Sequence, residues 1–417
     1  MRAKVYIHER AHSNGKSYFS CPIPDLNMAP PVHIVAVTAL LASIVSAWNP
    51  WERKTVTITR TEDHTKYITK TRSYAVSGTC APSTTGSGPP VYPTKPSSPK
   101  SQWPGWADIS HMVVFGDSYT TTGFNDTLAQ PNESNPLGNP VYPGYTATNG
   151  PNWVDFLTTT YNKTFLETIN LAYGGATIDS ALVAPYLPTV LSVKEQVNAE
   201  FLPVYGSSPS FFPWKSDDTL FATFIGINDV GNAYQEANKS AIYPKEFVEY
   251  AALQDQLYQA GARNFLFLNV PPVDRSPLTA GQGAAAQASE KADIAAWNAN
   301  VTALAANLTE TYSDATTFVF DTNALFTQVL DDPASHVETA PYRNTTDYCE
   351  SCKSCSVAVR YMGQALTSRA DMNGTPSWYT FYQNCSIPVD EYFWLNSLHP
   401  TFRMMNVTAQ EIARQLG

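Results

Sequence analysis

From about residue 108 onward, short apolar segments alternate with longer segments that have helical spacing. The short segments have the length and the flanking turn residues of buried strands, and they are Met112–Phe115, Thr168–Ala172, Leu220–Ile225, Asn264–Val270 and Thr317–Phe320. The helical segments are Asn152–Tyr161, Pro244–Ala260, a long one from about Ala284 to Tyr312, and Thr408–Leu416. Strands that alternate with helices form a parallel sheet covered on both faces. The pattern predicts an α/β domain with three α/β/α layers and a doubly wound sheet of about five strands.

One of the predicted strands runs directly into a turn that could carry chemistry. The apolar run Met112–Phe115 is stopped by Gly116-Asp117-Ser118, so Ser118 would lie just past the carboxyl end of a buried strand. Open α/β sheets bind their ligands at that edge. A serine there can be a nucleophile if a base and oxyanion donors converge on it. The alternative is a strand followed by an ordinary Asp-Ser turn.

Three later segments favour the nucleophile. After Gly-Asp-Ser at 116–118, the chain carries Gly-Gly-Ala at 174–176, Gly-Ile-Asn-Asp at 226–229 and Leu-His-Pro at 398–400. In this order the four blocks resemble those of the SGNH or GDSL hydrolases, a family named for the Ser, Gly, Asn and His of its blocks. The resemblance covers roughly residues 108–417. It implies a flavodoxin-like fold and serine-hydrolase chemistry.

The resemblance also assigns roles to single residues. Ser118 would be the nucleophile and His399 the base. The oxyanion hole would combine the N–H of Ser118, placed at the start of a helix, the backbone N–H of Gly175 and the side-chain amide of Asn228. Gly175 is preferred to Gly174 because an alanine follows it, as in the family's block. The alternatives are a helix-entry glycine for Gly175, a helix cap for Asn228 and an uninvolved surface histidine for His399.

The block around His399 departs from the family pattern at one position. The family carries Asp three residues before this histidine, where this chain has Asn396. Asp390 and Glu391 are near but out of register. We expect Asn396 to orient the imidazole of His399 without adding charge. We expect Asp117 to organise its turn by hydrogen bonding rather than by acid–base work.

Three stretches are similar to the fungal secreted acetylesterases of carbohydrate esterase family sixteen. They are Gly-Asp-Ser-Tyr-Thr at 116–120, Pro-Pro-Val-Asp-Arg-Ser at 271–276 and Leu-His-Pro-Thr at 398–401. The implied activity is removal of acetyl groups from small-molecule or oligosaccharide esters of plant cell-wall sugars, by a monomer without metal or organic cofactor. Two alternatives stay open: a lipase or acyltransferase that acts on lipid esters, and a non-catalytic carbohydrate-binding relative.

The N-terminal hundred residues divide into three segments by composition. Residues 1–27 are polar and patternless, whereas residues 28–47 form a hydrophobic run that ends in Val-Ser-Ala, as in a secretory signal peptide. We expect translation to begin at Met28, so that residues 1–27 are a non-native extension. The segment 28–47 has no Lys or Arg after Met28, and an uncleaved anchor is the alternative.

A Thr/Ser/Pro-rich linker is predicted for residues 48–105, ahead of a hydrolase domain at 106–417. Lys54–Arg60 alternates like a strand, but the Ser/Pro/Gly run after it cannot support a core. Four tryptophans flank the linker, and we expect them to pack at the domain entrance rather than to bind carbohydrate: Trp48, Trp51, Trp103 and Trp106.

Charge and glycosylation signals indicate an extracellular protein. The net charge is −10 with a pI near 5.2 and no basic cluster. This argues against a nucleic-acid partner and against binding to anionic membranes. The sequence has no run of 18 or more apolar residues, so membrane insertion is not predicted. Ten Asn-x-Ser/Thr sites, which predict N-glycosylation on export, lie at Asn125, Asn132, Asn162, Asn238, Asn300, Asn307, Asn344, Asn373, Asn384 and Asn406.

The six cysteines lie apart from the catalytic blocks. Their positions are Cys21, Cys80, Cys349, Cys352, Cys355 and Cys385. In a cytosolic protein the cluster would suggest zinc or iron–sulfur, but in a secreted chain disulfides are favoured. The preferred bridge is Cys349 to Cys385, because it would close a long loop just before His399. The sequence leaves the connectivity open.

Overall fold

The computed structural model describes residues 6–8, 55–57, 103–352 and 385–417. The chain divides into two compact units, Met1–Lys95 and Pro96–Gly417. In the first unit, strand β1 (Tyr6–His8) pairs antiparallel with β2 (Thr55–Thr57). The strand at Thr55–Thr57 agrees with the alternating pattern there, but β1 lies in a segment where no packed element was predicted. The proposed signal peptide and most of the linker lie outside the described residues.

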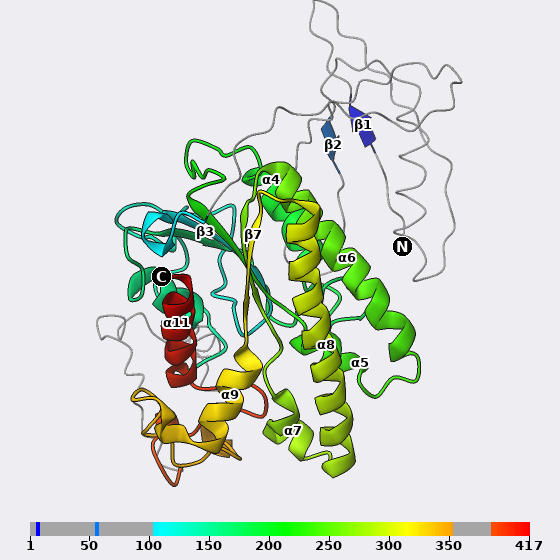
Figure 1. Cartoon of the computed structure of the whole chain (residues 1–417), viewed down its shortest axis with the longest axis vertical. Helices are drawn as coiled ribbons and strands as arrows, with labels where there is room; N and C mark the ends of the chain where they lie inside the picture. Colours follow the sequence, from blue (N-terminus) through cyan, green and yellow to red (C-terminus); the bar gives the residue numbers. More distant parts are fainter. Residues whose placement is uncertain (1–5, 9–54, 58–102, 353–384) are drawn as a thin grey trace, which may run out of the picture. The chain divides into compact units, whose positions relative to one another are not determined.

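The second unit is built on a five-stranded parallel sheet (Figure 1). Its strands are β3 (His111–Gly116), β4 (Glu167–Asn170), β5 (Thr219–Phe224), β6 (Asn264–Leu268) and β7 (Thr316–Phe320). They lie in the order β4-β3-β5-β6-β7, and every neighbouring pair is parallel. The chain places β4 on one side of β3 and then β5, β6 and β7 on the other side, as in a doubly wound fold. The predicted fold class and strand number are confirmed.

Helices cover both faces of this sheet. They are α2 (Trp153–Thr159), α3 (Val193–Glu195), α4 (Leu202–Val204), α5 (Ile227–Ala233), α6 (Lys239–Ala260), α7 (Pro277–Ala280), α8 (Ala284–Thr311), α9 (Thr322–Asp331) and α11 (Phe402–Leu416). Shorter turns are the 3₁₀ helices Trp106–Asp108, Val273–Arg275, Pro333–Ser335, Glu350–Cys352 and Val389–Glu391, and a π-helix at Gln196–Phe201. Helix α2 packs against α11. Helix α6 packs against α8 (Figure 1).

The last helix begins earlier than its sequence pattern predicts. It starts at Phe402 rather than Thr408, because Phe402 and Met404 are buried and Asn149 accepts the N–H of Phe402 through its Oδ1 at 2.9 Å. The N-cap is Thr401, so the helix begins three residues after His399. Because this helix packs on the core, it fixes the position of the short segment that carries His399.

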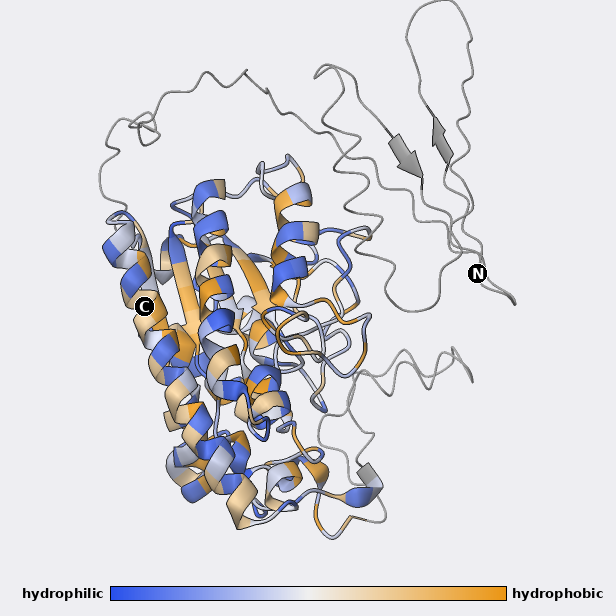
Figure 2. Cartoon of the chain, turned by 90° about the vertical axis from the view of Figure 1, so that its right-hand side faces the viewer, coloured by the Kyte–Doolittle hydropathy of each residue, from blue (hydrophilic) through white to orange (hydrophobic). Residues whose placement is uncertain are grey.

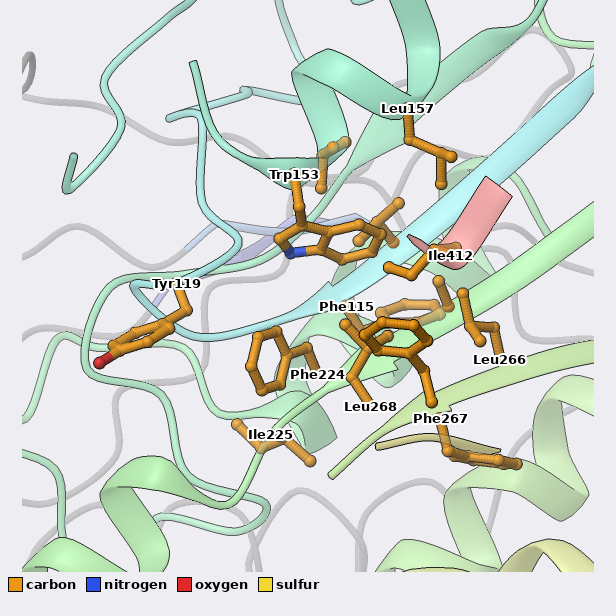
Figure 3. Packing of buried hydrophobic residues seen from close by; sticks show 14 of the residues in the cluster. Phe115, Tyr119, Trp153, Leu157, Phe224, Ile225, Leu266, Phe267, Leu268 and Ile412 are labelled. Carbon is orange, nitrogen blue, oxygen red and sulfur yellow. The ribbon is translucent and has the colours of Figure 1, made fainter. Parts of the chain in front are cut away.

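The core lies between the sheet and its helices, where hydropathy colouring shows apolar strands beneath amphipathic helices (Figure 2). Phe115 on β3 and Leu266 on β6 are buried together with Trp153 of α2 and Ile412 of α11 (Figure 3). Full burial of such a side chain contributes roughly 1.5–3 kcal/mol. The strand that leads to Ser118 is therefore held within the buried core of the unit, where all six of its residues are buried.

Two of the four tryptophans pack at the N-terminal start of this unit. The indole N–H of Trp103 donates to the carbonyl of Leu416 at 3.1 Å, and that of Trp106 donates to the carbonyl of Tyr161 at 2.9 Å. This confirms a packing role for both, and it places Trp103, assigned to the linker, on the folded unit. Trp48 and Trp51 lie outside the described residues.

Candidate active site

Ser118 and His399 are brought together although 281 residues separate them. The Nε2 atom of His399 lies 2.7 Å from the Oγ of Ser118, and its Nδ1 atom lies 3.1 Å from the Oδ1 of Asn396. An amide oxygen can only accept, so it selects the tautomer with the proton on Nδ1. That tautomer presents an unprotonated Nε2 to the serine hydroxyl. The contact has the geometry of a nucleophile with its base.

Ser118 lies on a turn and not on a helix, so the prediction of a helix start there is wrong. The carbonyl of Asp117 accepts the N–H groups of Thr120 (3.1 Å) and Thr121 (2.9 Å), which closes the turn. The carbonyl of Thr120 then accepts from the side-chain amides of Asn152 and Asn170, each at 2.7 Å. These bonds occupy a carbonyl that a continuing helix would need. No helix dipole therefore acts on Ser118.

Asp117 is buried in this turn, as predicted for a residue that organises it by hydrogen bonding. Its Oδ1 accepts the N–H of Tyr119 at 2.9 Å. Burial raises the pKa of Asp117 to about 8, and the hydrogen bond from the Tyr119 N–H opposes that rise. The carboxyl is thus protonated below about pH 8, where it holds the turn and adds no charge beside Ser118.

Asn396 fixes both the backbone and the ring of the histidine loop. Its Oδ1 accepts the N–H groups of Leu398 (3.0 Å) and His399 (2.9 Å) in addition to its contact with the ring. Burial lowers the pKa of His399 to about 4. Among the described residues no carboxylate opposes this effect. The two acidic residues of this loop are paired elsewhere, Asp390 with Arg403 at 2.6 Å and Glu391 with Arg343 at 3.0 Å.

Gly175 lies on a loop that is tied to the elements of both other oxyanion candidates. Two residues before it, Tyr173 donates its N–H to the carbonyl of Gly116 at 3.0 Å. One residue after it, the carbonyl of Ala176 accepts from the side-chain amide of Asn228 at 2.9 Å. Gly175 has a φ of +86°, which favours glycine, whereas Gly174 has an ordinary φ and open space around it.

Three N–H donors are left free to bind an oxyanion. Among the residues that the structure describes, no group accepts the backbone N–H of Ser118 or of Gly175. The Asn228 amide uses one of its two N–H bonds on Ala176 and keeps the other. Asn228 does not cap α5, whose N-cap is Gly226. Backbone and side-chain donors of this kind stabilise the tetrahedral intermediate of acyl transfer.

Two residues that support the site were not found from the sequence. The side-chain amide of buried Gln196 contacts both backbone groups of Gly116: Oε1 accepts its N–H at 3.0 Å and Nε2 donates to its carbonyl at 2.9 Å. Tyr119 (Figure 3) donates its hydroxyl to the carbonyl of Leu398 at 2.6 Å. No motif marks Gln196, since only the fold brings it to Gly116, 80 residues away. Tyr119 adjoins the nucleophile, but its partner Leu398 is 279 residues away in sequence.

The preferred cysteine pairing is present in the structure, and eight of the ten predicted glycosylation asparagines can be placed on it. Cys349 and Cys385 form a disulfide, which packs with Tyr392 and Leu395 under the chain that leads to His399. Closing a loop of this length stabilises the fold by roughly 3–4 kcal/mol in the chain-entropy model. Of the ten glycosylation asparagines, the eight described ones are exposed or half-exposed, and Asn373 and Asn384 lie outside the described residues.

The described ranges contain neither a metal-binding group of three His, Cys, Asp or Glu side chains nor a helix with the length and apolarity to cross a membrane.

Comparison with known proteins gives a family for this fold and site. Residues 112–409 match the model of the GDSL-like lipase/acylhydrolase family. The chain belongs to that family. An acetylesterase from Thermothelomyces thermophilus is 41% identical to this GDSL hydrolase over 254 residues, which cover 60% of this chain and 82% of the relative. The protein is therefore a carboxylic ester hydrolase.

More distant relatives of the GDSL hydrolase have been found. A thermolabile hemolysin from Vibrio parahaemolyticus serotype O3:K6 is 27% identical over 64% of this chain and 57% of its own length. Among solved structures, an acetylxylan esterase from Geobacillus stearothermophilus aligns over 74% of this chain and 94% of its own, with 12% identity and a TM-score of 0.38.

Proposed function

We propose that this hydrolase is a secreted serine esterase that removes acetyl groups from plant cell-wall saccharides. The observation that carries the chemistry is the contact of 2.7 Å between the Oγ of Ser118 and the Nε2 of His399, with Asn396 on the opposite ring nitrogen. An intact contact of this kind argues against a non-catalytic carbohydrate-binding relative. The acetyl preference is supported by the acetylesterase that shares 41% of its residues over the aligned region.

In the first half of the reaction, the Oγ of Ser118 attacks the ester carbonyl carbon and its proton moves to the Nε2 of His399. The carbonyl oxygen gains negative charge and takes hydrogen bonds from the N–H groups of Ser118 and Gly175 and from the Asn228 amide. The intermediate collapses with cleavage of the bond to the alcohol oxygen. His399 returns the proton to that oxygen, the alcohol leaves, and the acetyl group stays on Ser118.

In the second half, water attacks the acetyl-serine carbonyl while His399 accepts a proton from the water. The same donors stabilise the second oxyanion. Cleavage of the bond to Oγ then releases acetic acid, which loses its proton to water, and His399 returns the proton it accepted to Ser118. The Oδ1 of Asn396 keeps the ring orientation throughout, because it accepts the Nδ1 proton in both the neutral and the protonated imidazole.

Export of the enzyme is proposed from the hydrophobic segment 28–47, the ten glycosylation signals and the disulfide between Cys349 and Cys385. Disulfides of this type form in oxidising compartments. The exposure of the eight described asparagines is compatible with attached glycans. The enzyme made in a eukaryotic host should leave the cell and lose mass on enzymatic deglycosylation.

The chemistry is tested by labelling and by acetate release. An organophosphonate should modify Ser118 stoichiometrically and abolish release of acetate from vinyl acetate and from acetylated xylo-oligosaccharides. Ser118→Ala should fold normally, escape the label and lose at least about a thousandfold in kcat/KM, because nucleophile and base act as a unit. A folded Ser118→Ala protein with near-normal turnover would overturn the serine mechanism.

A further inference from the structure

Tyr186 is an exposed aromatic side chain that lies against the candidate oxyanion hole. Its residue is 71% exposed, although it is on the loop that connects β4 to α3 and carries Gly175. A Cβ atom added to Gly175 would lie only 2.2 Å from the Cε1 and 2.5 Å from the Cδ1 of the Tyr186 ring. One edge of the ring therefore meets Gly175, while most of its surface faces solvent.

The position of this ring is fixed by its loop. One turn after Asn228 on α5, the side-chain amide of Asn232 donates to the carbonyl of Ala184 at 3.2 Å. The helix that presents the oxyanion amide thus also holds the loop just before Tyr186. Pro185 and Pro188 flank the exposed pair of residues between them and restrict the backbone. An aromatic ring displayed on a restrained backbone loses little entropy when a ligand binds.

The chemistry of the ring indicates which part of an ester it would contact. The acyl part of an acetyl ester is a single methyl group, which cannot cover a ring that is 71% exposed. A pyranose ring in the alcohol half has a flat face of C–H groups of the size of the tyrosine ring. No described residue gives the Tyr186 hydroxyl a hydrogen bond, so the phenol is free to contact a ligand on its face and at its tip.

We propose that Tyr186 is the platform on which the sugar ring that carries the acetyl group stacks. The inference rests on the proposed function and specifies its alcohol side: the substrate is a pyranose ester, held beside Gly175 by contact with the phenol face. A lipid ester would instead place an acyl chain on this ring. If a sugar ring lies on Tyr186, activity should depend on the alcohol half of the ester. If an acyl chain lies there, activity should depend on the acyl half.

The test compares Tyr186→Ala and Tyr186→Phe with the wild type, by release of the free acid. On acetylated xylo-oligosaccharides, Tyr186→Ala should lower kcat/KM about tenfold, mainly through KM, because a stacking contact holds substrate and transition state alike. Tyr186→Phe keeps the ring and should stay within about threefold of the wild type. On vinyl acetate, whose alcohol half has no ring, both variants should match the wild type. The matched control is Phe165→Ala, an aromatic residue that is 44% exposed and precedes β4 at the opposite end of that strand.

Three results would contradict the stacking role of Tyr186 without contradicting the proposed esterase activity. Equal losses on both acetates would mean that Tyr186 only supports Gly175. A changed ratio of vinyl butyrate to vinyl acetate hydrolysis in Tyr186→Ala would place the acyl chain on the ring. No loss on the oligosaccharide would remove the contact altogether. A wild-type enzyme that releases acetate from vinyl acetate but not from acetylated oligosaccharides would instead refute the proposed saccharide substrate.

Discussion

Asn396 gives His399 an orienting partner without a charge. A carboxylate at this position would stabilise the protonated imidazole and raise its pKa. Here the ring is buried beside a neutral amide, and the two acidic residues of this loop are paired with arginines. The pKa of His399 is therefore lowered to about 4, and the base stays neutral in acidic media. The amide orients the ring as a carboxylate would, but it does not stabilise the protonated imidazole.

Asn396→Asp should move the acid limb of kcat/KM to higher pH by about one to three units. The new carboxylate keeps the acceptor for Leu398 and His399, so the turn should survive. It favours the imidazolium, which cannot accept the serine proton, so activity is lost at a higher pH than in the wild type. The measurement is the pH profile of kcat/KM on vinyl acetate.

The control for this exchange is Asn396→Ala, which removes the orienting oxygen and adds no charge. Its acid limb should stay in place, and its activity should fall far less than that of His399→Ala. An unmoved limb in Asn396→Asp would mean that the titration of His399 does not set the acid side of the profile.

At the scale of elements, the strands could be predicted because each is a short, largely apolar run that ends in a turn. The three central strands β3, β5 and β6 are buried throughout, whereas β7 at the edge is mostly half-buried. The structure has all five, with ends shifted by at most two residues, as at β4 and β6. The four catalytic blocks could be predicted for the same reason, since each follows a strand or, for His399, precedes a core helix. A strand that is buried on both faces appears in the sequence as an uninterrupted apolar run, which can be recognised without the structure.

Elements whose conformation depends on distant contacts could not be predicted. The turn at Ser118 lacks a helix because Asn152 and Asn170 occupy the carbonyl of Thr120, and neither asparagine is near it in sequence. The π-helix Gln196–Phe201 begins at a glutamine whose partner is Gly116, 80 residues away. Such bonds exist only once the sheet has formed, so no local pattern indicates them.

The π-helix supplies a further prediction, because Gln196 fixes the backbone two residues before the nucleophile. Gln196→Ala would leave the buried N–H of Gly116 without an acceptor, which costs about 1–3 kcal/mol of stability. It would also let Ser118 move relative to His399. We expect kcat to fall at least about tenfold with KM little changed, because positioning acts on the transition state.

The matched control is Gln254→Ala on α6. Gln254 is equally buried, but its side-chain amide makes no hydrogen bond among the described residues. It should change the melting temperature without a specific effect on kcat. If Gln196→Ala loses stability and keeps its kcat, the glutamine supports the fold alone.

At the scale of the whole molecule, the fold gathers buried carboxyl groups around the site. Burial raises the pKa of Asp117 to about 8 and that of Glu290 to about 7. Burial also raises the pKa of Asp229 and, with the charge of Asp229 beside it, that of Glu246. Asp229 is structural, since its Oδ1 accepts the N–H of Ile178 on the Gly175 loop at 2.8 Å.

These shifts set the direction in which stability depends on pH. The unfolded chain releases each of these protons near pH 4, whereas the folded protein keeps them to about pH 7 or above. The stability that they contribute is complete below pH 4 and is lost as the pH rises towards 8. His399 acts oppositely, since its pKa falls on folding; its contribution is complete above about pH 6.5 and is lost as the pH falls towards 4. Burial also raises the pKa of Asp155 and of Asp274, which act in the same direction as these four carboxyls. With six carboxyls against one imidazole, the carboxyls dominate between pH 5 and pH 8.

We therefore expect the melting temperature to be several degrees higher at pH 5 than at pH 8, on the order of 2–4 °C for each kcal/mol. Glu246→Gln is neutral at every pH and should reduce this difference, because the group that holds its proton most strongly no longer titrates. Glu310→Gln, on the exposed end of α8, should leave the difference as it is. Thermal unfolding followed by circular dichroism at both pH values measures it. Two results would contradict this expectation: a wild-type protein that melts higher at pH 8, or a Glu246→Gln variant with an unchanged difference in melting temperature. Either would mean that these carboxyls are ionised in the folded enzyme rather than protonated by burial.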